Sequence, residues 1–204
     1  MTAVPKLSFK EQMHQAREQA ILQSACRLLG VKAFDAMTMD DVAAEVGIAK
    51  ASLYKHFCSK EELCAAAMAQ LLQDVKAYLC QLPADMPPVE RLQSLVRWTL
   101  QRFMSQEMPL MPSRNSTLRT VLQANEAYQA TLATVSEQIT RWIVEAQQQS
   151  TINPALPPKL VLYTLYARGC DPVVSFLQEC DELTDEDIVN LVVRTCFDGL
   201  AARG

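Results

Sequence analysis

Apolar side chains recur along most of this chain at the three- and four-residue spacing of a helix face, and the chain holds only five glycines. Ile21, Ala25, Leu28 and Leu29, for example, fall on one face of a helix. β-rich folds need many turns, and turns consume glycine, asparagine and aspartate. The pattern therefore predicts an all-α fold.

Prolines and capping residues divide the chain into predicted helices. We expect helices over 8–29, 38–46, 50–57, 63–82, 89–105, 116–149 (one or two helices), 160–179 (interrupted at Asp171-Pro172) and 184–202. Gly30 is the predicted stop of the first helix, and Ser59 with Glu62 forms a predicted capping box. On the last helix the predicted apolar face is Ile188, Leu191, Val192, Cys196 and Leu200.

The charge is divided unevenly along the chain. Residues 1–60 hold eight Lys/Arg against six Asp/Glu, a charge of +2. Residues 61–204 hold eleven against seventeen, a charge of −6, so the two parts give the net charge of −4. A mildly basic head is compatible with contact to phosphates, whereas an acidic body is not.

The basic segment contains two short predicted helices around a glycine. Thr38 is a predicted N-cap, and Gly47 ends the first of the two helices. On the second, Leu53 and Phe57 face inward while polar side chains face outward. Two short helices joined in this way form a helix-turn-helix, whose second helix fits the major groove of DNA.

Residues 38–63 read TMDDVAAEVGIAKASLYKHFCSKEEL, which closely resembles the DNA-binding segment of the TetR family of regulators. The resemblance implies a helix-turn-helix DNA-binding domain over 1–60 and a helical dimerisation and ligand-binding domain over 61–204. It implies a cytoplasmic repressor, not an enzyme, that binds a near-palindromic operator in double-stranded DNA as a homodimer and is released by a small-molecule effector. The implied DNA-binding residues are Thr38, Lys50, Ala51, Ser52, Tyr54, Lys55, His56 and Lys60.

Two positions depart from the family pattern. Ala33 stands where a glycine is usual, and Ala49 stands where Ser or Thr usually caps the recognition helix. Loss of an N-cap costs about 1 kcal/mol. We therefore expect a slightly looser recognition helix.

The predicted body contains the elements of dimerisation and ligand binding. We expect 160–179 and 184–202 to pair with their symmetry mates as a four-helix bundle. Methionine and aromatic side chains can line a small-molecule pocket or form ordinary core. The candidate pocket residues are Phe103, Met104, Met108, Trp142, Tyr163, Tyr166 and Phe176.

Three alternatives remain open on the sequence alone. Seven dispersed cysteines without zinc spacing indicate reduced, mostly buried thiols, but Cys58 lies near basic residues and could act as a redox switch. Cys58 with His56 could instead form an enzymatic site, and the body could recruit a partner protein. We expect no cofactor, no metal and no membrane contact, and we expect His14 to face solvent.

Overall fold

The computed structural model describes residues 8–32, 34–109, 116–169, 171–179 and 182–202. All the regular elements that these residues form are helical, which confirms the predicted all-α class. No helix among them is long and apolar enough to cross a membrane. The prediction for Ala33 and those for two of the seven cysteines, Cys170 and Cys180, lie outside the described residues.

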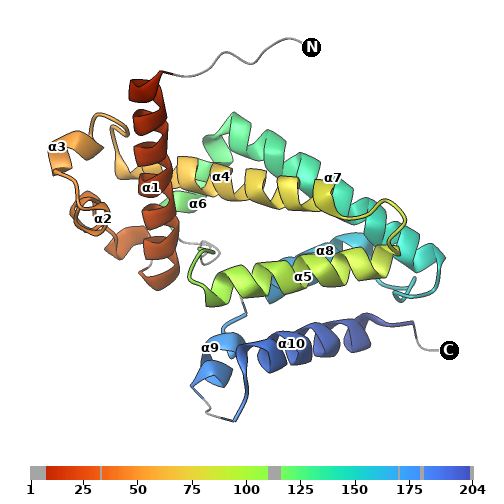
Figure 1. The fold of residues 1–204 in the computed structure, drawn as a ribbon. Helices are drawn as coiled ribbons and strands as arrows, with labels where there is room; N and C mark the ends of the chain where they lie inside the picture. The colour runs from red at the N-terminus through yellow and green to blue at the C-terminus, as the bar shows by residue number, and fades with distance from the viewer. Residues whose placement is uncertain (1–7, 33, 110–115, 170, 180–181, 203–204) are drawn as a thin grey trace.

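The chain folds into a small N-terminal head and a larger helical body (Figure 1). The head contains α1 (Phe9–Val31), the short 3-10 helix η1 (Phe34–Ala36), α2 (Met39–Val46) and α3 (Lys50–Leu53). The body contains α4 (Lys60–Gln81), α5 (Pro88–Met104), α6 (Thr117–Ala124), α7 (Glu126–Gln148), α8 (Pro158–Arg168), α9 (Val173–Gln178) and α10 (Asp185–Leu200). Helix α4 leaves the head and packs along α7, whereas α10 packs against α5 at the far side of the body.

Local capping explains where most of these helices begin. Helices α1, α2 and α10 all begin with capping boxes, at Ser8, Thr38 and Thr184. In each box the hydroxyl of the capping residue accepts a hydrogen bond from the backbone N–H three residues later. The carboxylate of that later residue accepts a hydrogen bond from the backbone N–H of the capping residue. Pro88 and Pro158 occupy the first positions of α5 and α8, where a missing N–H costs nothing. The predicted N-cap Thr38 is thereby confirmed, and Thr184 caps α10 at the start of the helix predicted over 184–202.

Two local predictions are wrong in detail. Helix α1 runs through Gly30 to Val31, so Gly30 does not end it. A Cβ atom at position 30 would lie 3.0 Å from the carbonyl oxygen of Met108, and glycine instead permits this close approach. Ser59 does cap α4, but the Glu62 carboxylate accepts from the backbone N–H of Cys58, 2.7 Å away, and thus the predicted capping box is incomplete.

The sequence left open whether 116–149 and 160–179 each form one helix or two, and each forms two helices. Asn125 separates α6 from α7, and its side chain accepts a hydrogen bond from the Tyr128 N–H at 2.9 Å. The interruption predicted at Asp171-Pro172 separates α8 from α9, and the Asp171 carboxylate accepts from the Val173 N–H at 3.1 Å. On the predicted apolar face of α10, Leu191 is 44% exposed, whereas Ile188, Val192, Cys196 and Leu200 are buried.

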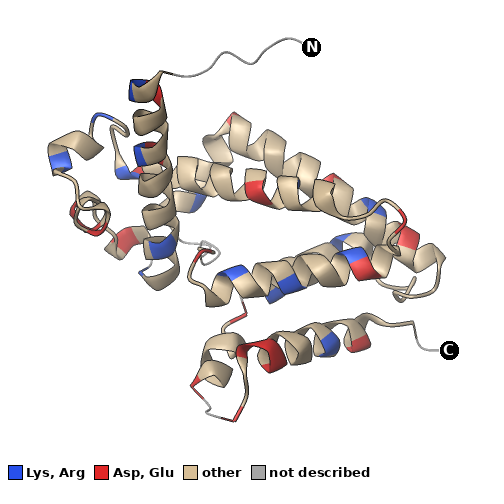
Figure 2. Ribbon diagram, viewed as in Figure 1, with Lys and Arg blue, Asp and Glu red and all other residues tan. Residues whose placement is uncertain are grey.

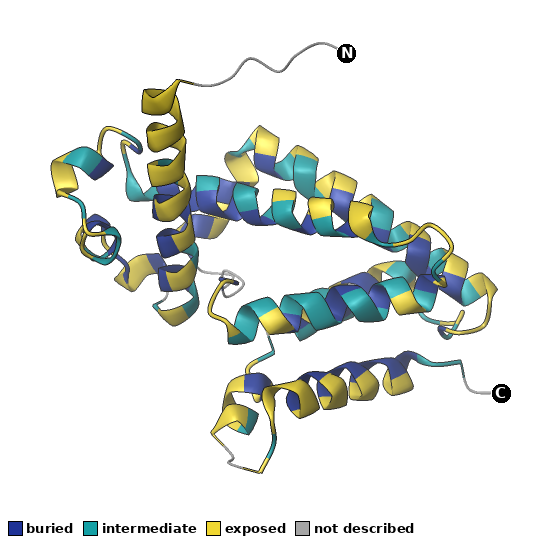
Figure 3. Ribbon diagram, viewed as in Figure 1, coloured by how far each residue is buried: buried dark blue, intermediate teal, exposed yellow. Residues whose placement is uncertain are grey.

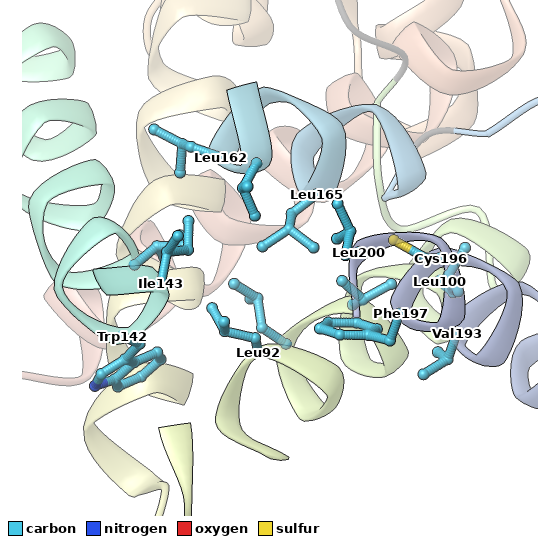
Figure 4. Packing of buried hydrophobic residues seen from close by; sticks show 14 of the residues in the cluster. Leu92, Leu100, Trp142, Ile143, Leu162, Leu165, Val193, Cys196, Phe197 and Leu200 are labelled. Carbon is cyan, nitrogen blue, oxygen red and sulfur yellow. The ribbon is translucent and has the colours of Figure 1, made fainter. Parts of the chain in front are cut away.

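Two hydrophobic cores support the head and the body. The body core joins α4, α5, α7, α8 and α10, and Figure 4 shows Leu92, Ile143, Leu165 and Phe197 converging in it. The head core extends past residue 60, because Leu63 and Met68 of α4 belong to it together with Leu118 and Leu122 of α6. Figure 3 shows this burial where α4 meets the head. A domain boundary at residue 60 stays a prediction. Helix α4 contributes residues to both the head core and the body core.

Candidate nucleic-acid interface

The packing of α2 and α3 forms the helix-turn-helix that the sequence predicts. Gly47 adopts the left-handed conformation, with φ of 72°, and this turns the chain from α2 toward α3. Val42 of α2 and Leu53 of α3 are fully buried in the head core. The apolar sides of both short helices are thus held inward, which directs their polar sides to solvent.

Two ion pairs fasten α2 to α1. The Arg27 guanidinium of α1 pairs with Glu45 of α2, and Lys32 Nζ lies 2.9 Å from Asp41 Oδ1. Hydrogen bonds from Lys32 and then from Thr38 lower the pKa of Asp41 to about 2. This carboxylate is therefore ionised at neutral pH, where it serves both the capping box of α2 and the ion pair with α1.

The segment that follows the turn exposes the predicted DNA-binding side chains. Lys50, Ala51, Tyr54 and Lys55 are exposed, and Tyr54 is an aromatic residue with 43% of its surface in contact with solvent. Figure 2 shows a basic side-chain position on α3 at the outer edge of the head. Exposed ammonium and phenol groups can donate hydrogen bonds to phosphate oxygens or base edges.

Lys50 already has an acidic partner within the head. Its Nζ donates to Asp40 Oδ2 at 2.7 Å, and this hydrogen bond raises the pKa of Lys50. Both side chains are at least half exposed. A surface pair of this kind contributes little to stability, so the ammonium can exchange the carboxylate for a phosphate at small cost.

Helix α3 is shorter than the sequence predicts. It ends at Leu53, and the chain then continues through turns from Tyr54 to His56. As expected from the substitution at its N-cap, Ala49 offers no side-chain hydrogen bond, although its carbonyl oxygen accepts from the N–H of Ser52 at 2.8 Å. The helix therefore depends on backbone bonds and on burial of Leu53.

Thr38 and Lys60 flank this segment and already have structural contacts. The Thr38 hydroxyl takes part in the capping box of α2. Lys60 Nζ donates to the Phe34 carbonyl oxygen at 3.0 Å and lies 4.2 Å from the centroid of the Phe34 ring. The structure thus places Lys50 through His56 in one continuous segment, with Thr38 and Lys60 at the starts of adjoining helices. Their DNA contacts stay predictions.

His56 contacts a second histidine that the sequence did not lead us to pair with it. The rings of His14 and His56 lie 4.4 Å apart, and His14 Nδ1 is 3.7 Å from a carboxylate oxygen of Glu18. Burial, and then the neighbouring His14, lower the pKa of His56. His14 is exposed, as expected, but it is not without partners. The i, i+4 spacing of His14 and Glu18 is readable in the sequence, whereas the approach of His56 depends on the fold.

Comparison with known families bears directly on the head. Residues 21–67 match the family model described as bacterial regulatory proteins, tetR family.

The head of this chain belongs to the tetR family.

Curated relatives of the tetR-family head are HTH-type regulators. BetI of Rhizobium meliloti is 30% identical over 86 residues, which cover 42% of this chain and 42% of BetI. IcaR of Staphylococcus epidermidis, a negative transcriptional regulator of the biofilm operon icaADBC, is 44% identical over 43 residues, 21% of this chain and 23% of IcaR. The chain spans less than half the length of such relatives, and only 32% of an HTH-type regulator of Mycobacterium tuberculosis.

Solved structures share the fold over nearly the whole chain. The apo form of AibR superimposes with a TM-score of 0.62 at 22% identity, covering 92% of this chain and 99% of AibR. A tetR-family transcription regulator from Marinobacter aquaeolei also gives 0.62 at 20% identity, covering 95% of this chain and 100% of that protein. The body therefore has the same fold as these proteins, behind a tetR-family head.

The seven candidate pocket residues do not converge on one cavity. Tyr163 and Tyr166 line a hollow of about 380 Å³ with α7 residues, and Met104 lines another of about 650 Å³ beside α10. Trp142 and Met108 are buried, and Trp142 lies in the body core. Phe103 packs partly buried against that core, and Phe176 is exposed on α9. A ligand-binding role for these residues stays a prediction.

A third cavity lies between the tetR-family head and the body. Its volume is about 730 Å³, and its walls come from α1, α2, α4 and the end of α5. Ser24 of α1 and Arg102 of α5 contribute to the lining. Within the described part of the chain, the Ser24 hydroxyl and Arg102 Nε are buried without a hydrogen-bond partner. Buried polar atoms are usually satisfied, so these two atoms are exceptions.

The cysteines only partly follow the prediction of buried thiols. Cys64 and Cys196 are buried and Cys26 is partly buried, but Cys58 and Cys80 are exposed. Burial raises the pKa of Cys26 to about 11 and that of Cys64 to about 12, which makes both thiols unreactive at neutral pH. A redox role for Cys58 stays a prediction.

Proposed function

We propose that this chain is a transcriptional repressor that binds a near-palindromic operator as a homodimer and releases it when a small-molecule effector binds. The observation that carries the proposal is the set of exposed side chains Lys50, Ala51, Tyr54 and Lys55, which the helix-turn-helix of the tetR-family head presents to solvent. A helix presented in this way fits the major groove, and its cations neutralise phosphates.

The DNA-binding part is tested by selecting sites from a random double-stranded pool and then measuring variants on the recovered site. We expect Tyr54→Ala and Lys55→Ala to weaken binding while leaving the fold intact, because both side chains are exposed. The plot of log affinity against log salt has a negative slope, and Lys55→Ala should make that slope less negative by about one, as expected for one lost phosphate contact. Lys76→Ala, an exposed lysine of α4, is the matched control. Undiminished affinity in both test variants would refute the assignment of this segment.

The dimer is supported by exposed apolar residues on the last helices of the body. Leu160 and Tyr163 of α8 are 51% and 55% exposed, and Leu191 of α10 is 44% exposed. Helices α8 and α10 contact each other, so these side chains can contribute to one face. Symmetric pairing of that face would form a four-helix bundle and bury it.

Sedimentation velocity provides the test of the dimer. We expect the natural chain to sediment as a dimer and Leu191→Arg to sediment as a folded monomer, because a charge would be buried without a partner. The control is Ala77→Arg, at an exposed position of α4, and this variant should remain dimeric. A Leu191→Arg protein that dimerises like the control would show that another surface is used.

The cavity between head and body supports the effector part of the proposal. A ligand changes a conformational equilibrium only if it binds the two states with different affinity. Because Ser24 belongs to the head and Arg102 to the body, any movement of the head alters this cavity and hence its affinity. The unpartnered polar atoms of these two residues would hydrogen-bond to the effector.

Acyl-coenzyme A thioesters are the first class to test. One neighbour of the same fold, 22% identical with a TM-score of 0.60, is AibR in complex with isovaleryl coenzyme A and operator DNA. We expect isovaleryl coenzyme A to release DNA from the natural chain, Ser24→Ala to need more of it, and free coenzyme A to have no effect. Retention of DNA across a panel of acyl chain lengths would refute this effector class.

A further inference from the structure

The chain contains two histidines, and the fold brings both to the same place. His14 belongs to α1, and His56 follows α3 more than forty positions later. With Glu18 they form a cluster in which one ligand-type atom of each residue lies within 4.8 Å of those of the other two. We propose that His14, Glu18 and His56 bind a divalent transition-metal ion of the zinc type.

The chemistry of the donors fits such an ion. Two imidazoles and one carboxylate are the three protein ligands found in many zinc sites, with water or substrate in the fourth position. Imidazole nitrogen favours zinc, copper or nickel over magnesium and calcium, which prefer oxygen ligands. The set is therefore selective by its donors, and it leaves a coordination position open to solvent.

The geometry requires only a small adjustment. Ligand atoms of a tetrahedral zinc ion lie about 3.4 Å apart when each bond is about 2.1 Å. His14 and Glu18 stand at i and i+4 on α1, so they share one helix face, and their side chains are 59% and 44% exposed. Side-chain rotation on this exposed face can bring the three donors together without moving the backbone.

His56 provides the independent evidence. Its Nδ1 is buried and has no hydrogen-bond partner among the described residues. Its ring already faces His14, with the centroids 4.4 Å apart and the planes inclined by 36°. Coordination through Nδ1 would satisfy this otherwise unpaired atom, whereas a simple ring contact does not.

Occupancy would tie α1 to the segment proposed to contact DNA. The same imidazole is a predicted phosphate contact, so zinc binding and DNA binding would share His56. This link rests on the proposed function, whereas the metal site does not. The experiment is therefore carried out on the full chain, untagged, in the absence of DNA.

Nuclear magnetic resonance of the imidazole groups tests the site, because only His14 and His56 contribute signals. On titration with zinc alone, we expect both imidazole signals to shift together and to saturate at one ion per chain. Glu18→Gln and His14→Gln should weaken zinc binding at least tenfold, measured by competition with a chromophoric chelator. Glu61→Gln, a carboxylate of α4 outside the cluster, should bind zinc like the natural chain.

Both substituted side chains of α1 are well exposed, so the variants should fold, and circular dichroism checks this. Zinc uptake that leaves the imidazole signals unmoved would place the ion away from both histidines and overturn the proposal. So would natural affinity in folded His14→Gln. Failure of DNA binding in the earlier test would leave these signals unaffected, and the two proposals can therefore fail separately.

Discussion

Restoring the missing N-cap of α3 by Ala49→Ser should stabilise this helix, which we propose contacts DNA. Position 49 already has the extended backbone of an N-cap, with φ of −66° and ψ of 140°, and its side chain is exposed. A serine can therefore accept from the N–H of Ala51 or Ser52 without a change of backbone or a clash. Exchange of Ala for Ser at an N-cap is worth about 1 kcal/mol.

That free energy corresponds to roughly a fivefold change in an equilibrium constant. If α3 opens locally, the Tyr54 amide, which bonds to the Lys50 carbonyl at 3.1 Å, should exchange with solvent about fivefold more slowly in Ala49→Ser. Affinity for the selected operator should rise by no more than the same factor, since a ligand gains only from the added population of the competent state.

The matched control is Ala44→Ser, at an exposed interior position of α2. There serine cannot cap, and its weaker helix propensity should cost up to about 0.5 kcal/mol. Urea unfolding and hydrogen exchange measured on both variants separate capping from a general effect of serine. Equal behaviour of the two variants, or faster exchange at Tyr54 in Ala49→Ser, would refute the view that α3 is limited by its missing cap.

Three further outcomes follow from burial and charge. Ile139→Ala empties a fully buried position in the body core and should lower the free energy of unfolding in urea by about 2–5 kcal/mol; a loss below about 1 kcal/mol would contradict that packing. Iodoacetamide at pH 8 should label exposed Cys58 in the folded chain, whereas Cys64, with its pKa raised to about 12, should react only after unfolding, as mass spectrometry can show. Because the pKa of Asp41 is lowered to about 2, its contribution to stability is present above its ordinary value of 3.8 and is lost as the pH falls from about 5 to 2. Asp41→Asn should remove that part of the pH dependence of the urea midpoint, and parallel curves for the two proteins would contradict it.

Much of the fold was predictable because its signals are local. The caps at Thr38 and Thr184 involve residues three positions apart, and the breaks at Pro88 and Pro158 act on their own helices. Such signals involve residues close together in the chain, so they can be recognised without knowing how the helices pack. The helix-turn-helix was readable for the same reason, since Gly47 and the apolar residues around it lie within a few turns of one another.

The candidate sites were harder to predict, because they depend on how helices pack. Seven pocket candidates share a residue type but are divided between core, surface and two separate hollows. The cavity between head and body is lined mainly by polar side chains, such as Ser24 and Arg102, that no pattern of methionines and aromatics would select. The family resemblance implies that Lys60 binds DNA. Its hydrogen bond to the Phe34 carbonyl could not be predicted, because it depends on how the chain folds.

By itself, the sequence determined the helical class, the caps at Thr38 and Thr184 and the helix-turn-helix, because each depends on residues close together in the chain. Tertiary structure alone decided that Gly30 accommodates the Met108 carbonyl rather than ending α1, and that Leu191 faces outward. It alone joined His14 and Glu18 to His56. These features arise from the relative placement of helices distant in the chain, and that placement follows from burying both hydrophobic cores at once.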